Sequence, residues 1–175
     1  MAYHGGWLEA TTDVIARAVA DQTGSSYYGI QWPDGAPHLS SLQFDPEHSP
    51  ALRTFLDHVH TVITIHGYGR RGYWASLLVG GTNRDLAGHV AGHLRDALPV
   101  YDIIDDLDKI PSELRGLHAR NPVNRPTNAG VQIELPPRVR GTTPMFWDWE
   151  GPGPSPHTQR LIAGLAKAVE TWPSD

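Results

Sequence analysis

The chain contains the stretch VHTVITIHG at residues 59–67. Almost every residue from 59 to 65 is β-branched, and such a run is typical of a strand that is buried on both faces. The strand should end at His66-Gly67, because the glycine lets the backbone turn away. His66 is therefore expected at the edge of a sheet, either as a functional imidazole or as a hydrogen-bonded histidine at a strand end.

On both sides of this run, helices and strands alternate. Further strands are expected over 26–31, 38–43, 74–79 and 131–135. Helices are expected with Thr12 and Asn83 as N-caps, and with Pro50 and Pro156 at their first positions. Residues 99–128 show little regular pattern. The alternation predicts an α/β fold with a mixed, largely parallel sheet flanked by helices, in which a site lies at the carboxyl ends of strands.

The length of 175 residues fits a single catalytic domain over 1–175, with a loop over 141–155 and a C-terminal helix over 156–172. A net charge of -5 argues against a general nucleic-acid binder. No apolar run is long enough to span a membrane, and the N-terminus lacks the features of a signal peptide. We expect a monomer that has no nucleic-acid or membrane partner. It would act in the cytoplasm or be released by lysis or a non-standard route.

The absence of cysteine means that a metal ion would have to be held by His, Asp or Glu. The segment HGGWLE at residues 4–9 places a histidine and a carboxylate five residues apart. Gly5 and Gly6 allow the sharp turn that brings His4 and Glu9 to one ion. With His66 they complete a set of two histidines and one glutamate, which is a known catalytic zinc set. The alternative is a surface His4 and a helix-start Glu9.

A second candidate lies in the segment GVQIEL at residues 130–135. The two-residue repeat of a strand puts Gln132 and Glu134 on one face and the apolar residues on the other. A carboxylate in such apolar surroundings can have a raised pKa and act as a general base. The alternative is an edge-strand acid that faces solvent.

Arginines gather in the middle of the chain, where nine of the twelve lie between residues 66 and 140. Arginine suits the bidentate recognition of carboxylates, so this distribution indicates an anionic substrate. His89 and His93 have helical i, i+4 spacing, but no glutamate follows the first histidine as in zinc-binding helices of the His-Glu-x-x-His type. We expect both to be exposed helix residues.

Taken in order along the chain, the motifs resemble those of the phage poly-γ-glutamate hydrolase family. They are HGGWLE (4–9), IHG (65–67), GGTN (80–83), NPVNR (121–125) and GVQIEL (130–135). The resemblance spans about residues 3–140 and implies a zinc-carboxypeptidase-like fold that hydrolyses γ-glutamyl amide bonds. It implies Zn²⁺ ligands at His4, Glu9 and His66, and a catalytic carboxylate at Glu134. It implies substrate-side roles for Asn83, Arg84, Asn124, Arg125 and Arg138. Only three residues precede His4, so either the first strand is very short or the chain is a trimmed or shortened form.

The expected function is therefore a zinc-dependent hydrolase acting on an anionic γ-glutamyl polymer or peptide, with poly-γ-glutamate first. Two other hydrolase functions fit the same residues: an amidase of cell-wall γ-glutamyl peptides and a deacylase of small N-acyl amino acids. A different class is a catalytically inactive polymer-binding or phage structural module. The full ligand set together with Glu134 favours an active enzyme over that module.

Overall fold

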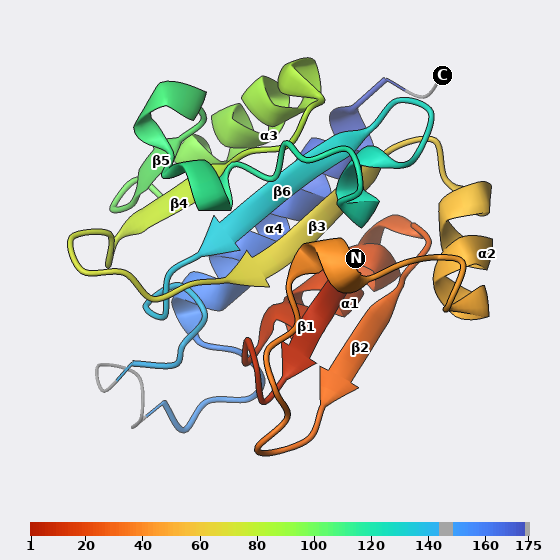
Figure 1. The fold of residues 1–175 in the computed structure, drawn as a ribbon. Helices are drawn as coiled ribbons and strands as arrows, with labels where there is room; N and C mark the ends of the chain where they lie inside the picture. Colours follow the sequence, from red (N-terminus) through yellow and green to blue (C-terminus); the bar gives the residue numbers. More distant parts are fainter. Residues whose placement is uncertain (144–148, 174–175) are drawn as a thin grey trace.

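The computed structural model describes residues 1–143 and 149–173, and Figure 1 shows their arrangement. The strands are β1 (Ala2–Gly6), β2 (Gly29–Trp32), β3 (Val62–Gly67), β4 (Ser76–Val79), β5 (Asp102–Ile104) and β6 (Gly130–Leu135). The α-helices are α1 (Thr12–Thr23), α2 (Pro50–His58), α3 (Arg84–Ala97) and α4 (Pro156–Thr171). Short 3₁₀ helices occupy connecting segments: η1 (Ser41–Gln43), η2 (Leu107–Lys109), η3 (Ser112–Leu114) and η4 (Pro122–Asn124).

The strands form a four-stranded sheet of order β3-β6-β4-β5, with β1 and β2 as a parallel pair beside it. β3 runs parallel to β6 and β4 runs parallel to β5, whereas β4 is antiparallel to β6. Two bonds of Met1 join β1 to β3: its amino group donates to the Ile63 carbonyl at 2.8 Å, and its carbonyl accepts from the Ile65 N–H at 2.9 Å. The predicted α/β class with a mixed, largely parallel sheet is confirmed.

One face of the sheet packs against helices. In Figure 1, α1 and α4 lie behind the strands and α3 runs beside α4. Alternate strand residues such as Ile65, Leu77 and Ile133 enter this core and meet Ile15, Leu94 and other apolar side chains of the helices. Burial of such side chains contributes about 1.5–3 kcal/mol each and fixes the register of the strands.

The opposite face carries polar side chains at its centre. In the register of β3 and β6, Thr64 lies opposite Gln132 and His66 lies opposite Glu134. All four are buried, with exposed fractions of 5% or less. The connecting segment that contains η4 contacts both strands and helps to cover this face. The sheet therefore separates an apolar side from a polar side, and every candidate catalytic group lies on the polar side.

Several predicted element boundaries need correction. The expected strand over 38–43 is wrong: the segment contains η1, because Ser40 and Gln43 form a reciprocal capping box there. The N-cap of α1 is Thr11, not Thr12, whose hydroxyl instead donates to the Glu9 carbonyl at 2.8 Å. The three-residue strand β5 was not expected, since so short a strand leaves little sequence pattern.

Other expected elements agree with the structure. Asn83 caps α3 by accepting from the Leu86 N–H at 3.0 Å, and α2 and α4 both begin at the expected prolines. The expected loop over 141–155 includes residues 144–148, which lie outside the described part. Within the described residues, no helix combines the length and apolarity that crossing a membrane requires.

Candidate metal centre

The turn after β1 brings Glu9 back to His4. Gly6 has a φ of 70°, a conformation that favours glycine, and the Glu9 N–H donates to the His4 carbonyl at 2.9 Å. Gly5 has no space for a side chain, because a Cβ there would lie 2.4 Å from the Cβ of Asp13 on α1. The two glycines therefore allow α1 to pack against β1 while the chain reverses toward the histidine.

His4, Glu9 and His66 converge in a buried cluster. The Nδ1 atom of His4 lies 2.9 Å from Glu9 Oε1 and 3.1 Å from His66 Nδ1. Glu9 Oε2 lies 3.2 Å from His66 Nδ1 and also accepts from the Gly67 N–H at 2.9 Å. The structure thus brings all three predicted ligands together, with β1, its following turn and β3 each contributing one.

These distances fit a metal ion. Ligand atoms about 2.1 Å from a tetrahedral ion lie about 3.4 Å from one another, close to the separations observed here. Without an ion, the Nδ1 atoms of both histidines can donate to the Glu9 carboxylate, but this places two N–H groups 3.1 Å apart, where they repel each other. A cation bound by all three would satisfy them at once. The residues present therefore fit a metal held by two imidazoles and one carboxylate.

The rings of both histidines are held mainly by packing. Their Nε2 atoms are buried and have no hydrogen-bond partner among the described residues. The Tyr3 ring lies edge-on to both imidazoles, with centroid distances of 5.1 Å to His4 and 4.8 Å to His66. Tyr3 is itself fully buried, so its contacts fix the orientation of both rings.

Charge within the cluster already favours an ionised Glu9. Burial by itself would raise the pKa of Glu9, but the charge of His66 and hydrogen bonds from both histidines outweigh it and lower the pKa to about 2. Burial would lower the pKa of His66, but Glu9 reverses this and raises it. A cation bound between these three side chains would replace the histidine protons as the positive charge that stabilises ionised Glu9.

Glu134 lies beside the cluster as the strand partner of His66. Burial raises its pKa to about 7, and the negative charge of Glu9 acts in the same direction. Its Oε1 atom accepts from Gln132 Nε2 at 2.9 Å. The prediction that Gln132 and Glu134 share a face agrees with this bond. Glu134 is on a central strand and only 5% exposed, so it is not an edge-strand acid in solvent.

The model of the poly-γ-glutamate hydrolase family matches residues 1–159, which include all four of these residues. The chain belongs to the poly-γ-glutamate hydrolase family. The resemblance found in the ordered motifs is thereby confirmed.

This poly-γ-glutamate hydrolase family member covers different shares of its relatives' lengths. The SPbeta prophage-derived protein YoqZ of Bacillus subtilis (strain 168) is 28% identical over 138 residues, which is 77% of this chain and 47% of YoqZ. The chain thus spans about half the length of that curated relative. Two solved structures share its fold at 21% identity. A bacteriophage poly-γ-glutamate hydrolase has a TM-score of 0.77 over 96% of this chain and 80% of its own. The zinc-free apo form of YndL has a TM-score of 0.76 over 97% and 82%.

The sequence motifs assign no role to Arg140, yet the structure places it close to Glu9 and Glu134. Its Nη1 donates to the Ala10 carbonyl at 2.9 Å and its Nε to the Leu135 carbonyl at 3.2 Å, so it ties the Glu9 turn to the end of β6. Its positive charge acts on both Glu9 and Glu134. Gly67 makes room for it, since a Cβ there would lie 2.7 Å from the Arg140 Cζ. The one indication of this in the sequence is that Arg140 follows Glu134 by six residues, just after the Pro136-Pro137 turn.

Four of the five predicted substrate-side residues lie away from Glu134. Arg84 donates to the backbone carbonyls of Val79, Gly81 and Asp105. Asn83 donates to the Asn128 carbonyl before the amino end of β6. Asn124 accepts from Thr82 and donates to the Gly116 carbonyl. Arg125 follows η4 and is exposed.

The fifth, Arg138, lies over the Tyr101 ring, with its Cζ 5.3 Å from the ring centroid. The structure places none of the five in hydrogen-bond contact with the His-Glu-His cluster. A substrate contact for each stays a prediction.

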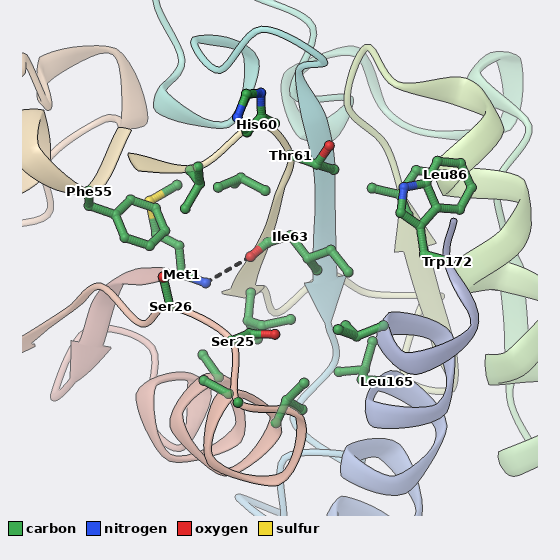
Figure 2. Close-up of a pocket in the computed structure, with 18 residues that line it drawn as sticks. Met1, Ser25, Ser26, Phe55, His60, Thr61, Ile63, Leu86, Leu165 and Trp172 are labelled. Atoms are coloured by element: carbon green, nitrogen blue, oxygen red, sulfur yellow. Dashed lines mark hydrogen bonds between the residues drawn. The ribbon is translucent and has the colours of Figure 1, made fainter. Parts of the chain in front are cut away.

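A cavity of about 410 Å³ lies elsewhere in the molecule, among α1, α2, β3 and α4. Figure 2 shows its lining, which includes Phe55, Ile63, Leu165 and Trp172. None of the four converging residues lines it. Its walls are mainly apolar and carry no carboxylate, so we assign the chemistry to the His-Glu-His cluster and Glu134 instead.

Proposed function

We propose that this chain is a zinc-dependent hydrolase that cleaves γ-glutamyl amide bonds, with poly-γ-glutamate as its substrate. The observation that carries the proposal is the convergence of His4, Glu9 and His66 next to the buried Glu134. The family membership supports the substrate. Two imidazoles and a carboxylate are typical zinc ligands, and the relative YndL has been solved in a form named for the absence of zinc.

His4, Glu9 and His66 would hold the ion through their Nδ1 and carboxylate oxygen atoms. A zinc ion bound there would polarise the amide carbonyl and lower the pKa of a water molecule. The protein supplies the rest: Tyr3 and the Gly67 N–H keep the three side chains in place. Exclusion of solvent around these buried groups strengthens every charge interaction in the centre.

Glu134 acts as the proton carrier. It takes a proton from the attacking water and passes it to the nitrogen of the leaving amine, so that amide and water become carboxylic acid and amine. A pKa of about 7 suits both halves of this cycle, because the carboxylate and the carboxylic acid are then of similar free energy at neutral pH.

Arg140 provides the positive charge for an anionic substrate. Its two backbone bonds use two of the five N–H groups of a guanidinium, and its Nη2 donates to no residue in the described part of the chain. We assign this nitrogen to a carboxylate of the glutamyl unit at the scissile bond.

The test is digestion of poly-γ-glutamate by purified protein, followed by the size distribution of the products. We expect shortening with zinc present, none after chelation, and recovery when zinc is restored. Parallel reactions on cell-wall γ-glutamyl peptides and on small N-acyl amino acids identify the substrate class. Tight binding of the polymer without cleavage in the presence of zinc would overturn the proposal in favour of a binding module.

A further inference from the structure

A row of buried polar side chains leads from Tyr3 to Glu134. The Tyr3 hydroxyl donates to Asn121 Oδ1 at 2.9 Å, and Asn121 Nδ2 donates to Gln132 Oε1 at 2.8 Å. Gln132 Nε2 then donates to Glu134 Oε1 at 2.9 Å. The exposed fractions of these four residues are 5% or less, so water does not compete for the bonds.

Backbone groups fix the direction of this row. Asn121 Oδ1 also accepts from the Val123 N–H at 3.3 Å, and a backbone N–H can only donate. The oxygen of Asn121 is therefore held in place, and its nitrogen must face Gln132. At the other side, Gln132 Nε2 lies 3.5 Å from the Leu114 carbonyl, which can only accept. Neither amide can turn over without losing a bond to the backbone.

We infer that Tyr3, Asn121 and Gln132 form a one-way hydrogen-bond row whose function is to hold Glu134 Oε1 as an acceptor and leave Oε2 as the oxygen that carries the proton. This inference rests on the proposed function of Glu134. Gln132 and Asn121 act through Glu134 and are positioning residues.

The position of Gln132 supports this assignment. It precedes Glu134 by two residues on the same face of β6, so the bond between them also fixes the side-chain torsions of Glu134 along the strand. With Oε1 occupied, a proton on that oxygen would face the N–H of Gln132 and be repelled by it. Oε2 is left to exchange the proton with the reacting water and the leaving amine.

The row also connects the proposed metal ligands to Glu134. Tyr3 contacts the imidazoles of His4 and His66 through its ring and begins the row through its hydroxyl. The same side chain therefore sets the orientation of two metal ligands and, through Asn121 and Gln132, that of the proton carrier. Tyr3→Phe keeps the ring contacts and removes the hydroxyl that begins the row, together with its hydrogen bond to Ser41.

The kinetic test compares Gln132→Met with Thr64→Val. Methionine has a similar length and no N–H donor. Thr64 lies opposite Gln132 on β3, is equally buried and has a hydroxyl without a described partner, so its loss is the matched control. We expect kcat of Gln132→Met to fall about 10- to 100-fold, with KM and zinc content unchanged, and Thr64→Val to match the wild type. An unchanged kcat, or equal losses in both variants, would overturn the inference.

A second measurement needs no substrate and no metal. In the zinc-free protein, the side-chain amide protons of Gln132 should resonate away from those of the exposed Gln22 and exchange slowly with water. Glu134→Ala should shift them strongly, Tyr3→Phe should shift them less, and Thr64→Val should leave them in place. Amide signals for Gln132 that coincide with those of Gln22 would refute the inference even if the enzyme is active. If instead no substrate is cleaved but these shifts occur, the row stands and the proposed activity fails.

Discussion

His66 and Glu134 are directly opposite each other on the parallel strands β3 and β6. Because facing residues in this register share one side of the sheet, the proposed metal ligand and the proposed proton carrier lie side by side without any loop to place them. A slip of one residue in either strand would send that side chain into the helix-covered core. The pairing of the two apolar strands therefore sets the geometry of the proposed reaction.

The role of Glu134 is tested by Glu134→Gln. The amide keeps the size of the side chain but cannot accept the proton, so we expect kcat to fall by about 10²- to 10⁴-fold with zinc still bound. Steady-state kinetics and metal analysis of the same samples measure both. Glu170→Gln, on the exposed end of α4, is the control. Wild-type turnover in Glu134→Gln would exclude Glu134 as the proton carrier.

Removal of a ligand should abolish metal binding. We expect His66→Ala to lower zinc affinity by more than about 100-fold, because even partners outside the ligand set typically contribute 10- to 100-fold. Titration calorimetry on chelator-treated protein measures this. The prediction that His93 is exposed is wrong, because it is half-buried on α3 and bonds to Thr171 of α4. It lies outside the cluster, so His93→Ala should bind zinc as the wild type does. Equal zinc binding by the two variants would contradict the assigned site.

As the pH rises from about 4.5 to 7, zinc-free protein should lose the stability that protonated Glu134 contributes. The buried Met1 amino group, whose pKa burial lowers to about 5, acts in the opposite direction over this range. Folding raises the pKa of Glu134 from 4.5 to about 7, so the native state holds its proton more tightly than the unfolded state does over this window. The loss should be at most about 3 kcal/mol. The raised pKa of His66 adds a loss in the same direction at higher pH.

Urea unfolding at pH 5 and pH 7 with a chelator present measures this loss. Between these two pH values the stability of Glu134→Gln should rise relative to that of the wild type, because the loss from Glu134 is gone while the Met1 amino group and His66 still titrate in both proteins. A wild-type pH dependence in that variant would show that Glu134 is not the group responsible.

A side chain at Gly67 should displace Arg140. A Cβ there would lie 2.7 Å from the Arg140 Cζ, so Gly67→Ala should move the guanidinium and break its two backbone bonds, which costs about 1–3 kcal/mol in the free energy of unfolding. Gly69, two residues on, has open space around its Cβ position, and Gly69→Ala should be close to neutral. Thermal unfolding of both variants tests the difference. Equal melting temperatures would mean that Arg140 does not lie on Gly67.

Long, strongly patterned elements could be predicted from the sequence. The β-branched run before His66, the Asn83 cap and the proline-initiated helices each depend on local rules, and the structure agrees with them. The pattern over 38–43 predicts a strand, but the bonds between Ser40 and Gln43 favour a 3₁₀ turn over extended backbone.

The site was predictable where residues lie at strand ends and not where loops fold back. His4, Glu9, His66 and Glu134 could be found because each follows a strand pattern or a glycine turn. Arg140 could not be assigned, since its contact with Gly67 depends on how the chain turns after Pro136-Pro137. Tyr3 and Asn121 are 118 residues apart, and no local pattern indicates that they share a hydrogen bond.

The fixed direction of the Tyr3–Asn121–Gln132 row limits how this sequence can diverge. An acid in place of Asn121 would lose the N–H that Gln132 needs, and an acid in place of Gln132 would face Glu134 without a donor. Each single step would leave a buried group unsatisfied, which typically costs about 1–3 kcal/mol. Positions 121, 132 and 134 should therefore change together among descendants of this protein, while an exposed amide such as Gln22 drifts on its own.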